Sequence, residues 1–207
     1  MAIVVDTCSL VMIAKNYLPL DKDGCLFTFL KDAFYRRELL LLDAILEETK
    51  HTSQGIAVDK MPFLKDKKLA IPTKDILPPS PRKFSNMMDN NFCVRLVKNE
   101  LTEQEYVQQK AEYSMTADYK ILVYSMKEQN LNGIIKEEYY VMTEETRLQN
   151  DGKLFKKLPL LCDKIGVETI TSSEYLHGKG FFIDKLHVCC AQFKTGEDHL
   201  CRHWRQE

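Results

Sequence analysis

The sequence predicts an α/β fold, with three α/β/α layers around a central parallel sheet of four or five short strands. Two observations predict it. Short apolar runs of strand length alternate with longer segments whose apolar residues recur at helical spacing. The strand candidates are also continuously apolar, which is the pattern of parallel strands that helices cover on both faces.

The first third of the chain supplies two strands and three helices. A strand over 2–5 is expected to end at Asp6, and a helix should follow over 9–17. A second amphipathic helix is expected over 24–36, and the run 39–42 should form the second strand. Asp43 has the chemistry of an N-cap for a helix that reaches about residue 53.

The middle of the chain favours helices. Four prolines between residues 72 and 81 predict a loop, and a helix is expected over 84–98. Thr102 and Glu105 have the spacing of a capping box, which predicts a helix that runs to about residue 129 with a break near 114–116. The extra helices of about 56–101 are expected to form an insertion in the domain.

The last third returns to alternation. It predicts a strand over 139–143, a helix over 158–165 and a strand over 167–170. These elements complete a domain that should span residues 1–176. Residues 177–207 are expected to form a C-terminal extension, helical from about 181 to 193.

Net charge, hydropathy and cysteine content indicate the cellular location of the protein but not its chemical activity. The net charge is −1, so no global positive field indicates a nucleic-acid partner. No apolar run approaches the roughly 18 residues of a membrane span, and the N-terminus lacks the pattern of a secretory signal. Seven scattered cysteines favour reduced thiols. We therefore expect a cytoplasmic protein without membrane contact.

Four acidic residues lie where the predicted topology brings chain segments together. Asp6 follows the first strand, Glu48 lies on the helix after the second, and Glu145 follows the third, while Asp118 begins a helix that should pack on the sheet. Carboxyl ends of parallel strands meet at one edge, so these side chains should converge. Converging carboxylates repel one another, and a hard divalent cation such as Mg²⁺ resolves that conflict.

The segments around these acids resemble a known family. The segment 4–10 (VVDTCSL) resembles the opening motif of PIN domains, and 42–48 (LDAILEE) is similar to the second motif. The segment 117–122 (ADYKIL) resembles the third, and 141–145 (VMTEE) the fourth, with Glu in place of the usual Asp. The segment 158–167 resembles the proline-led helix and final strand of some bacterial branches.

The resemblance implies a metal-dependent endoribonuclease with RNA as substrate, of a family in which toxin and defence roles are frequent. It implies that Asp6, Glu48, Asp118 and Glu145 are both catalytic residues and ligands of Mg²⁺ or Mn²⁺. An antitoxin or defence-complex partner, or a homodimer, is expected on the same ground.

Several assignments stay open at this point. Glu47 is an alternate for Glu48 because the helix phase is uncertain by one residue, and Glu144 is an alternate for Glu145. Asp6 and Asp118 also suit plain helix caps. Supporting or phosphate-contacting roles are expected for a set of nearby side chains: Thr7, Ser9, Thr143 and Lys120.

Two further hypotheses compete with the nuclease. One is a catalytically inactive PIN-like module that binds RNA or scaffolds a complex, and the other is a flavodoxin-like phosphoacceptor that uses Asp6 alone. The C-terminal tail holds a weak set of candidate zinc ligands: Cys189, Cys190, His199, Cys201 and His203. The alternative is that these cysteines are small buried apolar residues.

Overall fold

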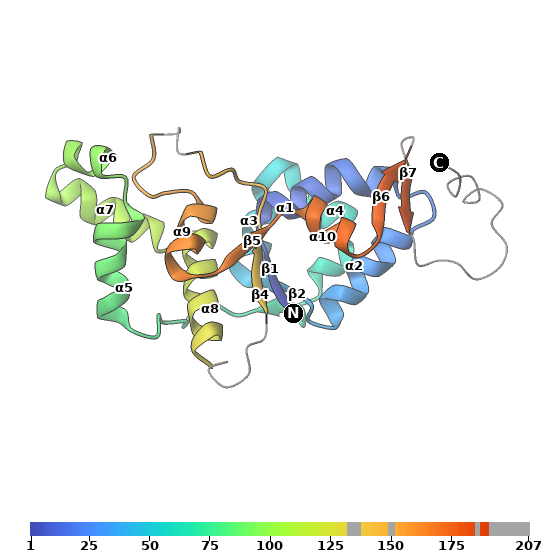
Figure 1. Ribbon diagram of the computed structural model, residues 1–207, viewed down its shortest axis with the longest axis horizontal. Coiled ribbons are helices and arrows are strands. Elements are labelled where there is room, and N and C mark those ends of the chain that lie inside the picture. Colours follow the sequence, from blue (N-terminus) through green and yellow to red (C-terminus); the bar gives the residue numbers. More distant parts are fainter. Residues whose placement is uncertain (132–137, 149–151, 185–186, 191–207) are drawn as a thin grey trace.

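A computed structural model describes residues 1–131, 138–148, 152–184 and 187–190 of the chain. Its centre is the predicted parallel sheet, which has five strands in the order β3-β2-β1-β4-β5 (Figure 1). The strands are β1 (Ala2–Val5), β2 (Leu39–Leu42), β3 (Ala70–Ile71), β4 (Tyr139–Met142) and β5 (Glu168–Ile170). The fold class predicted from the sequence is confirmed.

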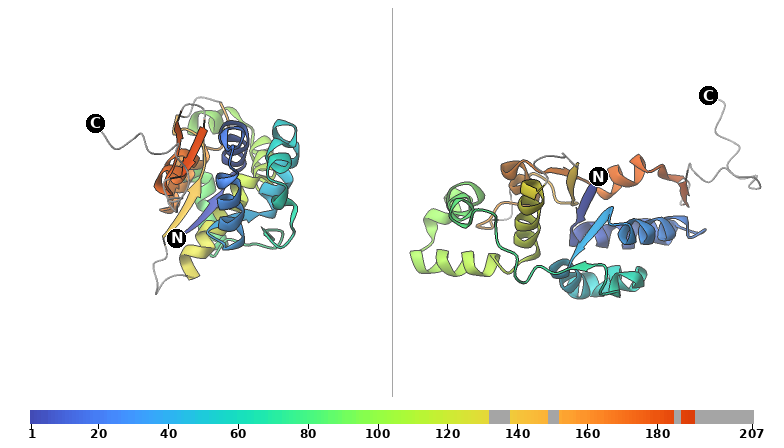
Figure 2. Two further views of the ribbon diagram at one scale, coloured as in Figure 1. Left: turned by 90° about the vertical axis from the view of Figure 1, so that its right-hand side faces the viewer. Right: turned by 90° about the horizontal axis from the view of Figure 1, so that it is seen from below.

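Helices cover both faces of this sheet. On one side lie α1 (Thr7–Met12), α2 (Cys25–Tyr35) and α4 (Ile56–Lys60), and on the other lie α8 (Ala117–Leu131) and α9 (Leu158–Ile165) (Figures 1 and 2). This division follows from right-handed crossovers, because the chain moves outward one way from β1 to β3 and the other way from β4 to β5. The strand order of the sheet therefore reverses between β1 and β4.

The connections between these elements are short helical turns. A π-turn over Ile13–Tyr17 and a 3₁₀ turn over Leu18–Leu20 follow α1, and 3₁₀ turns over Thr52–Gly55 and Pro62–Lys65 flank α4. Helix α3 (Asp43–His51) includes Asp43 itself, and its N-cap is Leu42, one residue before the predicted cap. The Asp43 carboxylate instead accepts hydrogen bonds from the backbone of Ala44 at 2.7 Å and of Thr73 at 3.0 Å, which ties α3 to the loop after β3.

Three helices project beyond α8 and α9 at one end of the molecule (Figure 1). They are α5 (Pro81–Met87), which continues as a π-turn over Met88–Phe92, α6 (Arg95–Glu100) and α7 (Glu103–Tyr113). The predicted capping box is present, since the Thr102 hydroxyl accepts from the backbone of Glu105 while the Glu105 carboxylate accepts from the backbone of Thr102. We refer to residues 81–113 as the arm.

The core explains why the strands form where they do. All four leucines of β2 are buried, and Ile3, Val4 and Val5 of β1 are fully enclosed. Strands enclosed on both faces need apolar side chains on both, so the continuous apolar runs are the expected sequence of the sheet's centre. Among the described residues, none of the helices has the length and apolarity that crossing a membrane requires.

The C-terminal region departs from the prediction. A short helix, α10 (Ser172–Gly178), follows β5, and the expected helix from about 181 is wrong where the structure describes it. Strands β6 (Phe181–Asp184) and β7 (His187–Cys190) form an antiparallel pair there. Gly180, at φ +82°, ends the helical path, and the aromatic and β-branched run behind it favours a strand. Phe181 packs on Phe29 of α2, with ring centroids 4.9 Å apart.

Candidate functional site

The predicted acids gather at the carboxyl edge of the sheet, where β1 and β4 run side by side. Val5 lies opposite Met142 in the register, and the Asp6 backbone N–H donates to the Met142 carbonyl at 2.9 Å. Residues that follow these two strands therefore enter the same crevice. In open parallel sheets, ligands bind in such crevices where the strand order reverses.

Asp6 is the most enclosed of the four acids, with 5% of its surface exposed. Its carboxylate accepts hydrogen bonds from the Thr7 backbone at 2.7 Å, the Cys8 thiol at 2.8 Å and the Thr143 hydroxyl at 3.1 Å. Burial nevertheless raises the pKa of Asp6 to about 6, and the negative charge of Glu145 adds to the shift. Asp6 thus caps α1 and also carries a charge that its surroundings do not fully stabilise.

Asp118 lies in the first turn of α8, and the charges of the three other acids act on its carboxylate. Burial is the largest cause that raises its pKa to about 8, and the charges of Asp6, Glu145 and Glu48 raise it further, while Lys153 opposes the shift. The charges of Asp6, Glu48 and Glu145 therefore all act on Asp118. The shared metal site that the sequence predicts stays a prediction.

Glu48 and Glu47 are separated clearly by the structure. The Thr7 hydroxyl donates to the Glu48 carboxylate at 2.8 Å, so Glu48 faces the crevice. Glu47 pairs with Lys50 at 2.5 Å on the exposed side of α3. The geometry therefore favours Glu48 over Glu47 as the residue near the other acids.

Glu145 and Glu144 are separated in the same way. The Glu145 carboxylate accepts from the Leu158 backbone N–H at 2.9 Å, at the N-terminus of α9, and it also lines a large cavity between the arm and the body. Glu144 turns away and accepts from the Ser172 backbone at 2.7 Å, at the start of α10. Its role is to hold α10 against the body.

The expected supporting residues fall into two groups. Thr7 and Thr143 contact the acids directly, through Glu48 and Asp6 respectively. Ser9 is fully buried and donates to Glu144 at 3.2 Å, so its hydroxyl is used in packing and does not face the crevice. The Lys120 ammonium lies 5.6 Å from the ring centre of Tyr119, and Lys120 is absent from the lining of the cavity beside the acids.

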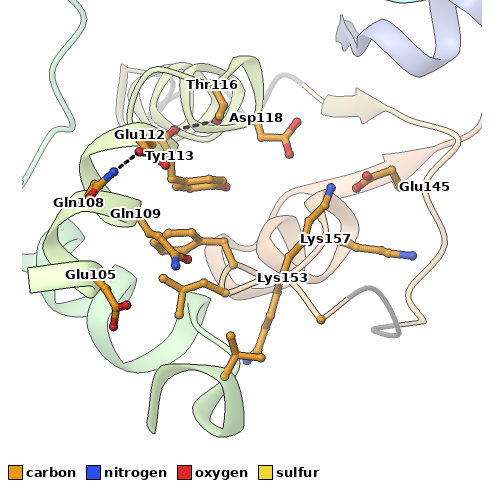
Figure 3. Close-up of a pocket in the computed structure, with 15 residues that line it drawn as sticks. Glu105, Gln108, Gln109, Glu112, Tyr113, Thr116, Asp118, Glu145, Lys153 and Lys157 are labelled. Atoms are coloured by element: carbon orange, nitrogen blue, oxygen red, sulfur yellow. Dashed lines mark hydrogen bonds between the residues drawn. The ribbon is translucent and has the colours of Figure 1, made fainter. Parts of the chain in front are cut away.

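This cavity, of about 680 Å³, opens beside the acids between α7 of the arm and the segment 152–157. Asp118 and Glu145 lie on facing sides of its inner end, with Lys153 and Lys157 close to them (Figure 3). The remaining wall carries amide, carboxylate and aromatic side chains from α7: Glu105, Gln108, Gln109, Glu112 and Tyr113. The cavity thus places Lys153 and Lys157 beside Asp118 and Glu145.

Two residues near the acids escaped the sequence reasoning. Cys8 donates to Asp6, and its own pKa is raised because the thiol is buried beside that carboxylate. Tyr113 lines the cavity, and within the described residues its buried hydroxyl has no hydrogen-bond partner. Cys8 could have been found from its place two residues after Asp6, whereas Tyr113 had no local signal because it belongs to the arm.

The donor set suits a hard divalent cation in chemistry, since it is made of carboxylate oxygens whose charges are poorly compensated. In the observed side-chain conformations, no three Asp, Glu, His or Cys residues in the described ranges are grouped so as to hold a metal ion. Three of the acids are engaged by hydrogen bonds instead, from Thr7, Thr143 and the Leu158 backbone.

The predicted zinc set lies largely outside the described residues. His199, Cys201 and His203 fall there, and Cys189 and Cys190 are described only as backbone positions of β7. Zinc binding by the tail stays a prediction. The cysteines that the structure does describe in full form no disulfide: Cys8, Cys25, Cys93 and Cys162.

Comparison with known proteins adds no relative. No family model matches the chain, and no curated protein or solved structure matches it significantly.

Proposed function

We propose that this chain is a divalent-metal-dependent endoribonuclease of the PIN type. The observation that carries the proposal is the placement of Asp6, Glu48, Asp118 and Glu145 at the carboxyl edge of a parallel sheet, where burial and the three other carboxylates raise the pKa of Asp118 to about 8. Such uncompensated charge is typical of sites that bind a cation or transfer a proton. The acids also follow the order of the family motifs along the chain.

Asp6, Asp118 and Glu145 would hold a Mg²⁺ or Mn²⁺ ion, with Glu48 oriented by Thr7 at its side. The bound ion would activate water and stabilise the oxygens of the phosphodiester during displacement. The chain's own residues position this chemistry: Thr143 and Cys8 orient the Asp6 carboxylate, and the N-terminus of α9 orients Glu145. Lys153 and Lys157 supply positive charge beside the acids for substrate phosphates.

The second candidate is an inactive PIN-like module that binds RNA or scaffolds a complex. One observation favours it: three of the four acids accept hydrogen bonds from the protein, and in the described residues the acids do not form a ready metal cage. Against it stands the retention of four converging acids, whose mutual repulsion destabilises the fold unless a cation offsets it. An antitoxin or defence-complex partner, or a homodimer, remains part of the proposal.

The test is cleavage of total cellular RNA with Mg²⁺ or Mn²⁺, with new ends mapped by sequencing. Asp6→Asn and Asp118→Asn should abolish the new ends, and EDTA should do the same until metal is restored. Glu47→Gln is the matched control, because it removes an equal charge on the exposed side of α3 and should cleave like the wild type. Equal cleavage by the wild type and both Asn variants would refute the mechanism, and RNA binding without cleavage would support the inactive module.

A further inference from the structure

A second concave site lies next to the acid-lined cavity. It has a volume of about 400 Å³ and is lined by Asn90, Asn91, Cys93, Val94, Arg95, Lys156, Leu160 and Lys164. Three of these side chains are cationic and none is a carboxylate. We call it the basic concavity, and neither the acidic cluster nor the family motifs account for it.

The wall between the two cavities is built by the arm and the segment before α9. Cys93 and Phe155 form an antiparallel bridge, Val94 donates to the Leu154 carbonyl at 2.8 Å, and the backbone of Lys156 donates to the Phe92 carbonyl at 2.9 Å. Lys156 lines both cavities. The two cavities therefore lie next to each other, with Lys156 in the lining of each.

The positive charges of this site have no carboxylate partners among the described residues. Within the described ranges, the side chains of Arg95 and Lys164 form no ion pair, and both residues are exposed. Arg95 is the first residue of α6, where a positive charge opposes the helix dipole. Lys164 lies in the last turn of α9, where the dipole does favour it. The Lys156 ammonium donates to the Asn91 carbonyl at 2.8 Å, which anchors its charge at the concavity.

Three cations around one hollow repel one another, and an anion relieves that repulsion. Nucleic-acid backbones offer regularly spaced phosphates, and Lys and Arg commonly bind them. The asparagine amides add hydrogen-bond donors of the kind that also bind phosphate or sugar oxygens. The hollow is thus suited to a phosphate of a flexible single strand, which can bend from one cavity into the next.

We propose that the basic concavity binds a backbone phosphate of single-stranded RNA away from the cleaved bond. The strand would pass from Asp118 and Glu145 along the lysines of the segment 152–157 and over Lys156 to Arg95 and Lys164. The proposal rests on the proposed function and deepens it, because it assigns the arm a part in substrate binding. It also makes an unpaired flank a requirement for tight binding.

The experiment measures binding without cleavage. Fluorescence anisotropy of a labelled oligouridylate is recorded in EDTA with the full-length wild type, with the double variant Arg95→Gln and Lys164→Gln, and with a control, Lys65→Gln and Lys67→Gln. The control removes two exposed charges that precede β3, at the opposite edge of the sheet. The basic-site variant should bind about 10-fold or more weakly. The log–log slope of its affinity against salt should fall by about 0.7 for each phosphate that it no longer neutralises.

The outcomes separate the two proposals. If the wild type cleaves RNA with Mg²⁺ and the basic-site variant binds oligouridylate as tightly as the wild type, the basic-site proposal is overturned and the nuclease proposal stands. If the basic-site variant binds weakly and cleavage with Mg²⁺ never occurs in any protein, the binding site stands and the nuclease fails. Uridine monophosphate is the last probe. Equal affinity for it and for the oligomer, abolished in the same variant, would assign the hollow to a small phosphate ligand and overturn the RNA path.

Discussion

The Thr7 hydroxyl donates a hydrogen bond of 2.8 Å to Glu48, a residue 41 positions further along the chain. This hydrogen bond joins the start of α1 to the middle of α3, and the Glu48 charge is one of those that raise the pKa of Asp118. The neighbouring Glu47 pairs with Lys50 outside. Both glutamates are exposed, so what distinguishes them is the partner: Glu48 accepts from Thr7 of α1, while Glu47, about 100° further round the helix, pairs with Lys50.

Glu48→Gln should lower RNA cleavage by about 10-fold or more, because it removes one of the charges expected to support the metal while keeping an oxygen that can accept from Thr7. Glu47→Gln changes the same charge on the same helix and should leave the rate within about twofold of the wild type. The measurement is the initial rate on one RNA substrate at saturating Mg²⁺. If Glu47→Gln lowered the rate and Glu48→Gln did not, Glu47 and not Glu48 would be the residue that supports the metal.

The metal-free protein should lose stability as the pH rises from 6 to 8. The pKa of Asp118 rises from 3.8 to about 8 in the folded chain, so the folded state keeps a proton that the unfolded chain has already released. Stability from this group is complete below the unfolded pKa and is lost as the pH approaches the folded pKa. Asp6, with a pKa of about 6, contributes mainly below this window.

Urea unfolding in EDTA at pH 6 and pH 8 checks the sign. Each pKa unit corresponds to about 1.4 kcal/mol, so the wild type should be at least about 1.4 kcal/mol less stable at pH 8. Asp118→Asn cannot ionise and should show a much smaller difference over the same interval. An equal pH dependence in both proteins would show that Asp118 is not the titrating group.

Divalent metal should raise the thermal transition of the wild type, because an ion held between carboxylates binds the folded state and offsets their repulsion. At a concentration 100 times its Kd, a ligand adds about 2.7 kcal/mol of stability. Asp6→Asn should lose most of this gain while being as stable as the wild type, or more so, in EDTA. Potassium sulfate at matched ionic strength separates ion binding from screening. An identical gain in both proteins would exclude Asp6 from the metal site.

The sheet could be predicted from the sequence because its central strands consist of apolar residues, which is the pattern of strands buried on both faces. The runs at 2–5 and 39–42 are apolar throughout, and only a strand enclosed on both faces needs that pattern. The C-terminal strands were misread although the aromatic and β-branched run from Phe181 favours a strand. The packing of Phe181 on Phe29, which comes from a distant helix, has no local signal in the sequence. Helix α10 was missed although Thr171 and Glu174 form a capping box, a local signal that the sequence does carry.

The acidic cluster was predictable because strand ends of a parallel sheet fix their residues by topology. Asp6 and Glu145 follow paired strands, so their convergence needs no knowledge of side-chain packing. The cavity walls were not predictable in this way. Tyr113 and Lys153 meet across the cavity only because the arm docks on the segment before α9 through the bridge between Cys93 and Phe155. Nothing local in either segment encodes that docking.

Tyr113→Phe should leave the stability of the metal-free protein unchanged, or raise it by up to about 1 kcal/mol. In the described part of the chain the buried hydroxyl has no hydrogen-bond partner, so its removal loses no bond and relieves a desolvated polar group. The ring itself carries the packing, since it stacks on Phe155 at 4.1 Å between centroids with an interplanar angle of 15°.

Tyr113→Leu is the contrasting variant, because it removes the ring as well as the hydroxyl. It should be less stable than Tyr113→Phe by about 0.5–1.5 kcal/mol, since the stacking of the ring on Phe155 is absent. Urea unfolding with a common m-value measures both changes. A loss of about 1 kcal/mol or more in Tyr113→Phe itself would mean that the hydroxyl makes a hydrogen bond on which folding depends, and it would assign Tyr113 a polar partner at the inner end of the cavity.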